Sequence, residues 1–277
     1  MKNGRIGLNI ALIVASGIAG PVSTAFAADP PPDLLRRMAA RETENAKALS
    51  NYTYRQIVVV QEYDNHGQNT GEYRETRDII FSPTRGRYEE AAGAPRNTLT
   101  HIKLTPEDFA DIRDIDPFLL TSDKVALYHG QYKGEETVDG FLCFVEDVRP
   151  RQILAGQRFF EGLLWARESD FAILKSQGQA VPQIETLKEQ NLTPHFTTIR
   201  QIIDGKWVFP TETYADDTLY FRDWPQRIRI EIRYMNYKQF GAESTVTYGS
   251  PQPPPANRPA PPPPSPQPPP VPQPPHH

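Results

Sequence analysis

The chain has 277 residues, a formal net charge of −4 from 30 Lys+Arg and 34 Asp+Glu, and a single cysteine. This acidic balance argues against a nucleic-acid-binding protein, which would need a basic surface. One cysteine also excludes an internal disulfide, so the fold must be stabilised by its apolar core.

The amino-terminal segment has the order of a secretory signal. Two basic residues precede an apolar run over residues 6–19, and the small-residue site AFA follows at 25–27. This order predicts a signal peptide over residues 1–27, cleaved near Ala27, and a periplasmic location. The alternative, a membrane anchor, is less favoured because the run is shorter than the ~20 apolar residues of a spanning helix. We expect no transmembrane segment after cleavage and a short linker at residues 28–32.

Two helices are predicted by spacing and capping. Residues 33–50 place apolar side chains at helical spacing, with Asp33 as the N-cap after three prolines. Thr105 followed by Pro106 and two acids predicts a short helix through about Arg113. Residues 112–120 are expected to be irregular or helical.

The rest of the chain from Tyr52 reads as strands. The clearest is RIRIEIRYMNYKQF at residues 227–240, in which isoleucines and Tyr234 alternate with charged residues. Residues 52–81 predict two strands joined by a turn. Further strands are predicted at residues 85–90, 125–132, 140–148, 158–167, 171–181, 196–204, 206–214, 227–238 and 243–248. About ten to eleven strands indicate one mainly β (α+β) domain over residues 33–249, built on an antiparallel sheet with one apolar face.

The composition changes abruptly after Gly249. Sixteen of the 29 prolines lie between Pro251 and Pro275, so residues 250–277 are predicted to be a disordered, extended polyproline tail. The tail could tether the protein or bind an envelope partner, and the alternative is an inert solubilising segment.

Three short stretches carry a family resemblance. They read FEGLLW at residues 160–165, DFAI at 170–173 and YMNYKQF at 234–240. With the long one-sided strands, these resemble the exported half-barrel proteins grouped around the periplasmic lipoprotein carrier, its outer-membrane receptor and the sensor that binds an anti-sigma factor. The resemblance implies a curved sheet closed over by helices, with an apolar concavity that accepts acyl chains.

The resemblance therefore implies a non-enzymatic carrier of lipid or lipoprotein acyl chains. The alternative is an envelope protein-interaction or sensing module, with a filled core and a proline-rich tether. Candidate lining residues, chosen because they alternate with polar neighbours or lie in central strands, are Ile79, Phe81, Leu142, Phe144, Leu164, Ile230, Ile232 and Tyr234. Each could instead be an ordinary core residue. The strands of Leu142 and Leu164 are apolar on both faces, so the direction of these two side chains cannot be read from sequence.

Other chemistry-bearing residues favour structural roles. The sequence contains no serine-hydrolase elbow, His-Glu-x-x-His or phosphate loop, so we expect no enzyme, no cofactor and no metal. Cys143 is expected to be a buried strand residue. The tryptophans are expected to be packing anchors, and the arginines at 227, 229 and 233 a solvated sheet face. Asp108, Asp111, Asp114 and Asp116 are expected to be a solvated helix face rather than a carboxylate pair or calcium loop.

Overall fold

The computed structural model describes residues 30–82, 86–117, 120–185 and 190–239. The chain divides into two units, residues 1–240 and 241–277, and every described residue belongs to the first. The predicted signal peptide, the strand at 243–248 and the proline-rich tail lie outside the described residues.

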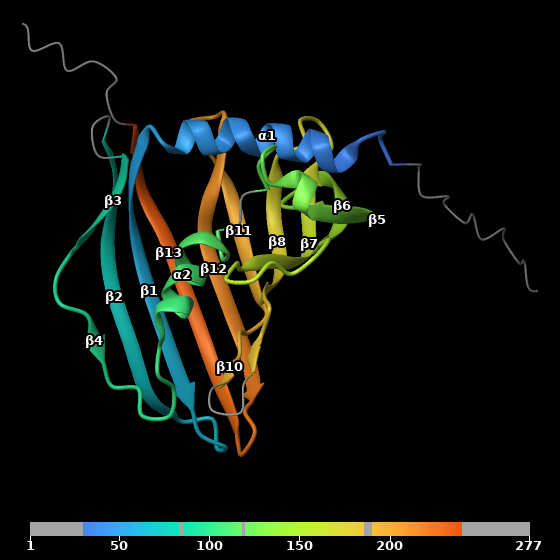
Figure 1. The fold of residues 1–277 in the computed structure, drawn as a ribbon. Helices are drawn as coiled ribbons and strands as arrows, with labels where there is room; N and C mark the ends of the chain where they lie inside the picture. Colours follow the sequence, from blue (N-terminus) through green and yellow to red (C-terminus); the bar gives the residue numbers. More distant parts are fainter. Residues whose placement is uncertain (1–29, 83–85, 118–119, 186–189, 240–277) are drawn as a thin grey trace, which may run out of the picture. The chain divides into compact units, whose positions relative to one another are not determined.

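Over the described residues, the fold is a large antiparallel sheet, a small sheet of β9 and β10, and two α-helices (Figure 1). Its strand order is β3-β2-β1-β13-β12-β11-β8-β7-β6-β5, and β4 pairs with β2. The sheet is curved and unclosed, with β3 and β5 at its edges, as expected of a half-barrel. The described elements are α1 (Leu34–Leu49), β1 (Tyr52–Tyr63), β2 (Asn69–Ser82), β3 (Gly86–Ala91), β4 (Arg96–Asn97), α2 (Pro106–Asp114), the 3-10 helix η1 (Val125–Leu127), β5 (Tyr128–Val138), β6 (Phe141–Pro150), β7 (Phe159–Arg167), β8 (Ile173–Val181), β9 (Ile184–Glu185), β10 (Gln190–Asn191), β11 (Phe196–Ile203), β12 (Trp207–Tyr220) and β13 (Pro225–Gln239).

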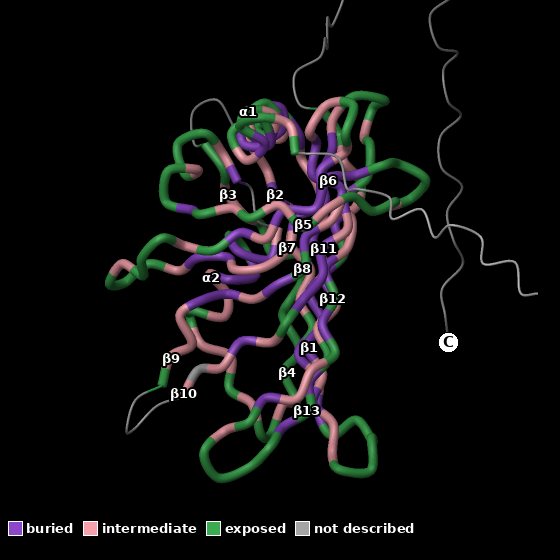
Figure 2. The backbone as a smooth tube through the Cα atoms, turned by 90° about the vertical axis from the view of Figure 1, so that its right-hand side faces the viewer, coloured by how far each residue is buried: buried purple, intermediate pink, exposed green. Residues whose placement is uncertain are grey.

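Helix α1 lies across one end of the strands and closes that end of the concave face (Figure 1). Its Leu34, Met38 and Ala39 pack against apolar side chains from β5, β6, β7, β8, β11 and β12. Buried positions gather in the strands near α1, whereas the hairpin turns at the far end are exposed (Figure 2). The part of the concavity beside α1 is therefore ordinary core.

A buried polar group attaches α1 to the sheet. Glu42 and Arg200 are both fully buried and form an ion pair of 3.3 Å. Asn45 donates to the Glu42 carboxylate at 3.0 Å and accepts from the Val208 amide at 3.4 Å. Burial raises the pKa of Glu42 although Arg200 opposes the shift. A shift of α1 along β11 and β12 would leave the buried charges of Glu42 and Arg200 unpaired, which is costly, so these contacts fix the position of the helix on the sheet.

Several strand boundaries differ from the sequence prediction. Strand β12 runs to Tyr220 rather than ending near Tyr214, because Asp216 is held in the ladder by Arg227 and Arg229 from β13 at 3.0 and 2.8 Å. Strand β5 begins and ends later than expected, since the apolar Val125–Leu127 forms a 3-10 turn and the polar residues after it form an exposed edge strand.

The expected face assignments of single residues are mostly confirmed. Cys143 is fully buried, and burial raises the pKa of its thiol to about 11. Trp165 is buried beside it, but Trp224 is 37% exposed. Arg233 pairs with Glu231 on the same exposed face as the Asp216 ion pairs.

Candidate functional site: a cavity on the concave face

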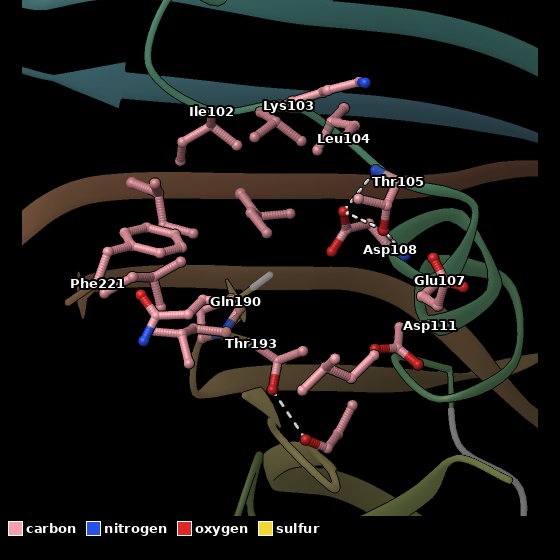
Figure 3. Close-up of a pocket in the computed structure, with 18 of the residues that line it drawn as sticks. Ile102, Lys103, Leu104, Thr105, Glu107, Asp108, Asp111, Gln190, Thr193 and Phe221 are labelled. Atoms are coloured by element: carbon pink, nitrogen blue, oxygen red, sulfur yellow. Dashed lines mark hydrogen bonds between the residues drawn. The ribbon is translucent and has the colours of Figure 1, made fainter. Parts of the chain in front are cut away.

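A cavity of about 930 Å³ lies on the part of the concave face that α1 does not cover. Its floor is apolar and comes from β1, β8, β11, β12 and β13. The floor residues are Val60, Ala180, Phe196, Leu219, Ile228 and Ile230. Its cover is the segment 101–116, including α2, together with β9, β10 and residues 192–194 (Figure 3).

Glu62 of β1 holds the first part of this cover in place. Its fully buried carboxylate accepts hydrogen bonds from Thr100 N (2.6 Å), Thr100 Oγ1 (2.7 Å), His101 N (2.9 Å) and Ile102 N (3.0 Å). Burial alone would raise the pKa of Glu62, but these hydrogen bonds outweigh it and the pKa is lowered. A charged side chain in the sheet therefore fixes a backbone segment that has no strand partner of its own.

Gly71 allows the cover to approach the sheet closely. A Cβ at this position would lie 2.5 Å from Thr98 O and 2.6 Å from Glu62 Oε1. Only glycine leaves room for the backbone of residues 98–99 against β2.

Helix α2 begins as the sequence predicts. Thr105 is the N-cap, Pro106 stands in the first turn, and Thr105 and Asp108 form a reciprocal capping box. Asp108 accepts from Thr105 N at 2.7 Å and from Thr105 Oγ1 at 2.9 Å. Ile112 packs against Val58, Val60 and Ile232 of the sheet, so the helix presents one face to the cavity.

The four acids of α2 and the turn after it do not form the expected solvated face. Asp108, Asp111 and Asp116 line the cavity, and only Asp114, with a side chain 58% exposed, remains in solvent. The prediction was wrong for Asp108 and Asp111 because they share one helix face with Ile112 at i, i+3 and i+4, and that face packs on the sheet. The i, i+3, i+4 pattern was the signal that could have shown this. The prediction was also wrong for Asp116, which lies in the turn after α2 and is buried.

Five acids line the cavity, and the exposed Glu107 and Asp223 are two of them. The other three, Asp108, Asp111 and Asp116, differ in their partners. Asp111 forms a two-pronged ion pair with Arg158, at 3.0 and 2.5 Å, and Arg158 also donates to the Pro182 carbonyl. Burial raises the pKa of Asp108 and of Asp111, with hydrogen bonds opposing the shift in each case. Asp116 is 7% exposed, and its pKa is raised well above the usual value, first by burial and then by Asp111 and Asp108.

Aromatic residues stand at the other side of the cavity. Phe221 and Trp224, in the turn between β12 and β13, stack with ring centroids 4.7 Å apart. Figure 3 places Phe221 on the opposite side of the cavity from Asp108 and Asp111. The cavity thus has an apolar floor, buried acids at one end and an aromatic pair at the other, where the exposed Arg222 and Asp223 also line it.

Of the eight lining residues predicted from sequence, Ile230 lines this cavity. Ile232 and Tyr234 are buried under α2, and Phe144 and Leu164 pack in the cluster around α1. Ile79 is fully buried, Phe81 is partly buried, and Leu142 is 44% exposed. Sequence reasoning missed the acids of α2 and the aromatic turn.

Two further observations concern the described residues. They contain no group of three or more His, Cys, Asp or Glu side chains arranged to hold a metal ion. None of their helices is long and apolar enough to cross a membrane.

No family model matches the chain, and no curated protein matches it. Among similar solved structures is a DUF1329 family protein from Desulfovibrio piger, at 14% identity and TM-score 0.36, with 78% of this chain and 96% of that chain covered. Another is a LolA superfamily protein from Nitrosomonas europaea, at 14% identity and TM-score 0.31, covering 73% and 93%. A third is the MucA/MucB complex of Pseudomonas aeruginosa, at 13% identity and TM-score 0.21, covering 76% and 99%. At these identities the likenesses concern the fold alone, and the ligand of this chain has to be inferred from its own residues.

Proposed function

We propose that the chain is an exported, non-enzymatic carrier that holds a lipid or lipoprotein acyl chain in the cavity on its concave face. The observation that supports this best is the cavity itself, whose volume of about 930 Å³ lies within the ~300–1,000 Å³ typical of small-molecule sites. The predicted signal peptide supports a periplasmic location for such a carrier.

The energetics of an apolar ligand fit this proposal. The floor offers aliphatic and aromatic side chains from five strands, and each methylene buried there would contribute about 0.8 kcal/mol. A long acyl chain would therefore gain several kcal/mol after ordering costs, with no chemistry on the ligand.

The alternative is an envelope protein-interaction or sensing module. It is supported by α1, which fills one end of the concavity with Leu34, Met38 and Ala39. In this alternative a protein partner binds through the proline-rich tail or an exposed sheet edge.

Native mass spectrometry with lipid extraction, on protein purified from a membrane-containing periplasmic extract, distinguishes the two. We expect co-purifying lipid or lipoprotein that is lost in Ile230→Glu, because Ile230 lines the cavity. Leu142→Glu is the matched control, since Leu142 is 44% exposed, and it should keep the ligand. Circular dichroism verifies that both variants fold. An unliganded mass, with no uptake of added acyl chains, would contradict the carrier and favour the interaction module.

A further inference from the structure

The acidic end of the cavity contains more carboxyl groups than it has partners for. Asp108, Asp111 and Asp116 all line it. Asp108 is held by Thr105 in the capping box, and Asp111 is neutralised by Arg158. Among the residues that the structure describes, no hydrogen bond or ion pair reaches the carboxyl group of Asp116.

Asp116 is held in this position by its backbone. Thr198 Oγ1 donates to the Asp116 carbonyl oxygen at 2.6 Å, and Thr198 Oγ1 also lies 2.7 Å from Thr213 Oγ1. The residue is only 7% exposed and yet lines the cavity. A buried polar group without a partner is costly, so a carboxyl group fixed at the end of a cavity indicates that its partner arrives with the ligand.

The charges around the cavity select the kind of partner. The basic residues that line it, His101, Lys103 and Arg222, are exposed, whereas Asp116 is buried. Burial, with the neighbouring Asp111 and Asp108, also raises the pKa of Asp116, because the ionised carboxylate is unfavourable there. An incoming cation would stabilise that ionised form. An anionic head group would meet like charge at this end.

We propose that the cavity accepts an amphiphile whose polar group is a primary ammonium, with Asp116 as its counter-ion and the apolar tail lying along the floor toward Phe221. This inference rests on the proposed function, because it assigns the polar end of the ligand of the same cavity. The inference goes beyond the proposed function because it names the charge of the ligand group that the cavity recognises.

Isothermal titration calorimetry with three C12 probes, dodecylamine, dodecanol and dodecanoate, tests the proposal at pH 7 and below their micellar concentrations. We expect dodecylamine to bind at least tenfold more tightly than either other probe. Asp116→Asn should remove this preference while leaving the affinity for dodecanol unchanged. Asp114→Asn is the matched control, because Asp114, the last residue of α2, lies two residues before Asp116 and has an exposed side chain, and it should keep the preference.

The other outcomes separate the two proposals. Equal binding of all three probes, or a preference for dodecylamine that survives Asp116→Asn, would overturn the ammonium assignment and leave the apolar carrier in place. No binding of any probe to a folded protein would overturn both.

Discussion

Replacing Glu62 with glutamine should detach the cover of the cavity from the sheet. The glutamine oxygen can keep the two contacts with Thr100, but its NH₂ group would face the amides of His101 and Ile102, which now donate to Glu62 Oε2. Two charge-assisted hydrogen bonds are lost, each worth ~1.5–3 kcal/mol. We expect a loss of about 3 kcal/mol in the free energy of unfolding.

The measurements are urea unfolding followed by circular dichroism, and hydrogen exchange of residues 98–105. The matched control is Glu72→Gln on β2, whose side chain is 31% exposed and pairs with Arg74. That variant should lose less than about 1 kcal/mol. Exchange in the 98–105 segment should accelerate in Glu62→Gln and not in the control.

The effect of Glu62 should also depend on pH. The pKa of Glu62 is lowered in the folded protein, so its stabilisation is complete above the unfolded value near 4.5 and is lost as the pH falls through the folded value. The difference between wild type and Glu62→Gln should therefore be constant from pH 7 to about 5 and shrink below. If the free energies of unfolding of wild type and Glu62→Gln differ by less than about 0.5 kcal/mol at pH 7, and the amides of residues 98–105 keep their protection, Glu62 does not anchor the cover.

Three further predictions concern other buried groups. Burial raises the pKa of the Glu146 carboxyl to about 7, so the ionised carboxylate destabilises the fold above pH 7 and the protonated group below pH 4.5 does not. Urea unfolding should therefore show that Glu146→Gln raises the free energy of unfolding by up to about 3 kcal/mol at pH 8 and by little at pH 4. An equal gain at both pH values would contradict this. Gly71→Ala should lose about 1–3 kcal/mol in thermal unfolding because its Cβ would meet Thr98 O at 2.5 Å; an unchanged melting temperature would refute the close approach. The Cys143 thiol, with a pKa of about 11, should resist iodoacetamide at pH 8 until denaturant is added, and rapid alkylation of native protein would count against its burial.

The fold could be predicted from local patterns because the strands and α2 carry their signals in sequence. Period-two alternation identified β13, and the Thr105-Pro106 start identified α2. The ends of β5 and β12 could not be predicted this way. The polar residues of β5 can stay in a strand because β5 is an exposed edge of the sheet. Those of β12 stay in a strand because Asp216 pairs with Arg227 of β13. Both reasons depend on which strand is the neighbour.

The site was harder to predict than the fold. Alternation predicts which face of a strand is apolar, but it does not say which stretch of that face a helix covers. Phe144 and Ile230 are both apolar strand residues, yet Phe144 packs in the cluster around α1 and Ile230 borders the cavity. The same uncertainty concealed Asp116, which was expected on a solvated helix face and is buried in the structure.

The pairing of β1 with β13 has a consequence for how the protein forms. Among the described strands, the first and the last in chain order are hydrogen-bonded neighbours, from Tyr52 opposite Gln239 to Tyr63 opposite Arg227. Hairpins β1–β2 and β12–β13 can form locally, but the pairing of β1 with β13 must await residues 225–239, and such long-range closure is slow. A chain threaded through a membrane pore from its amino terminus would keep β1 unpaired on that side until β13 emerged, and the sheet would then join across its middle.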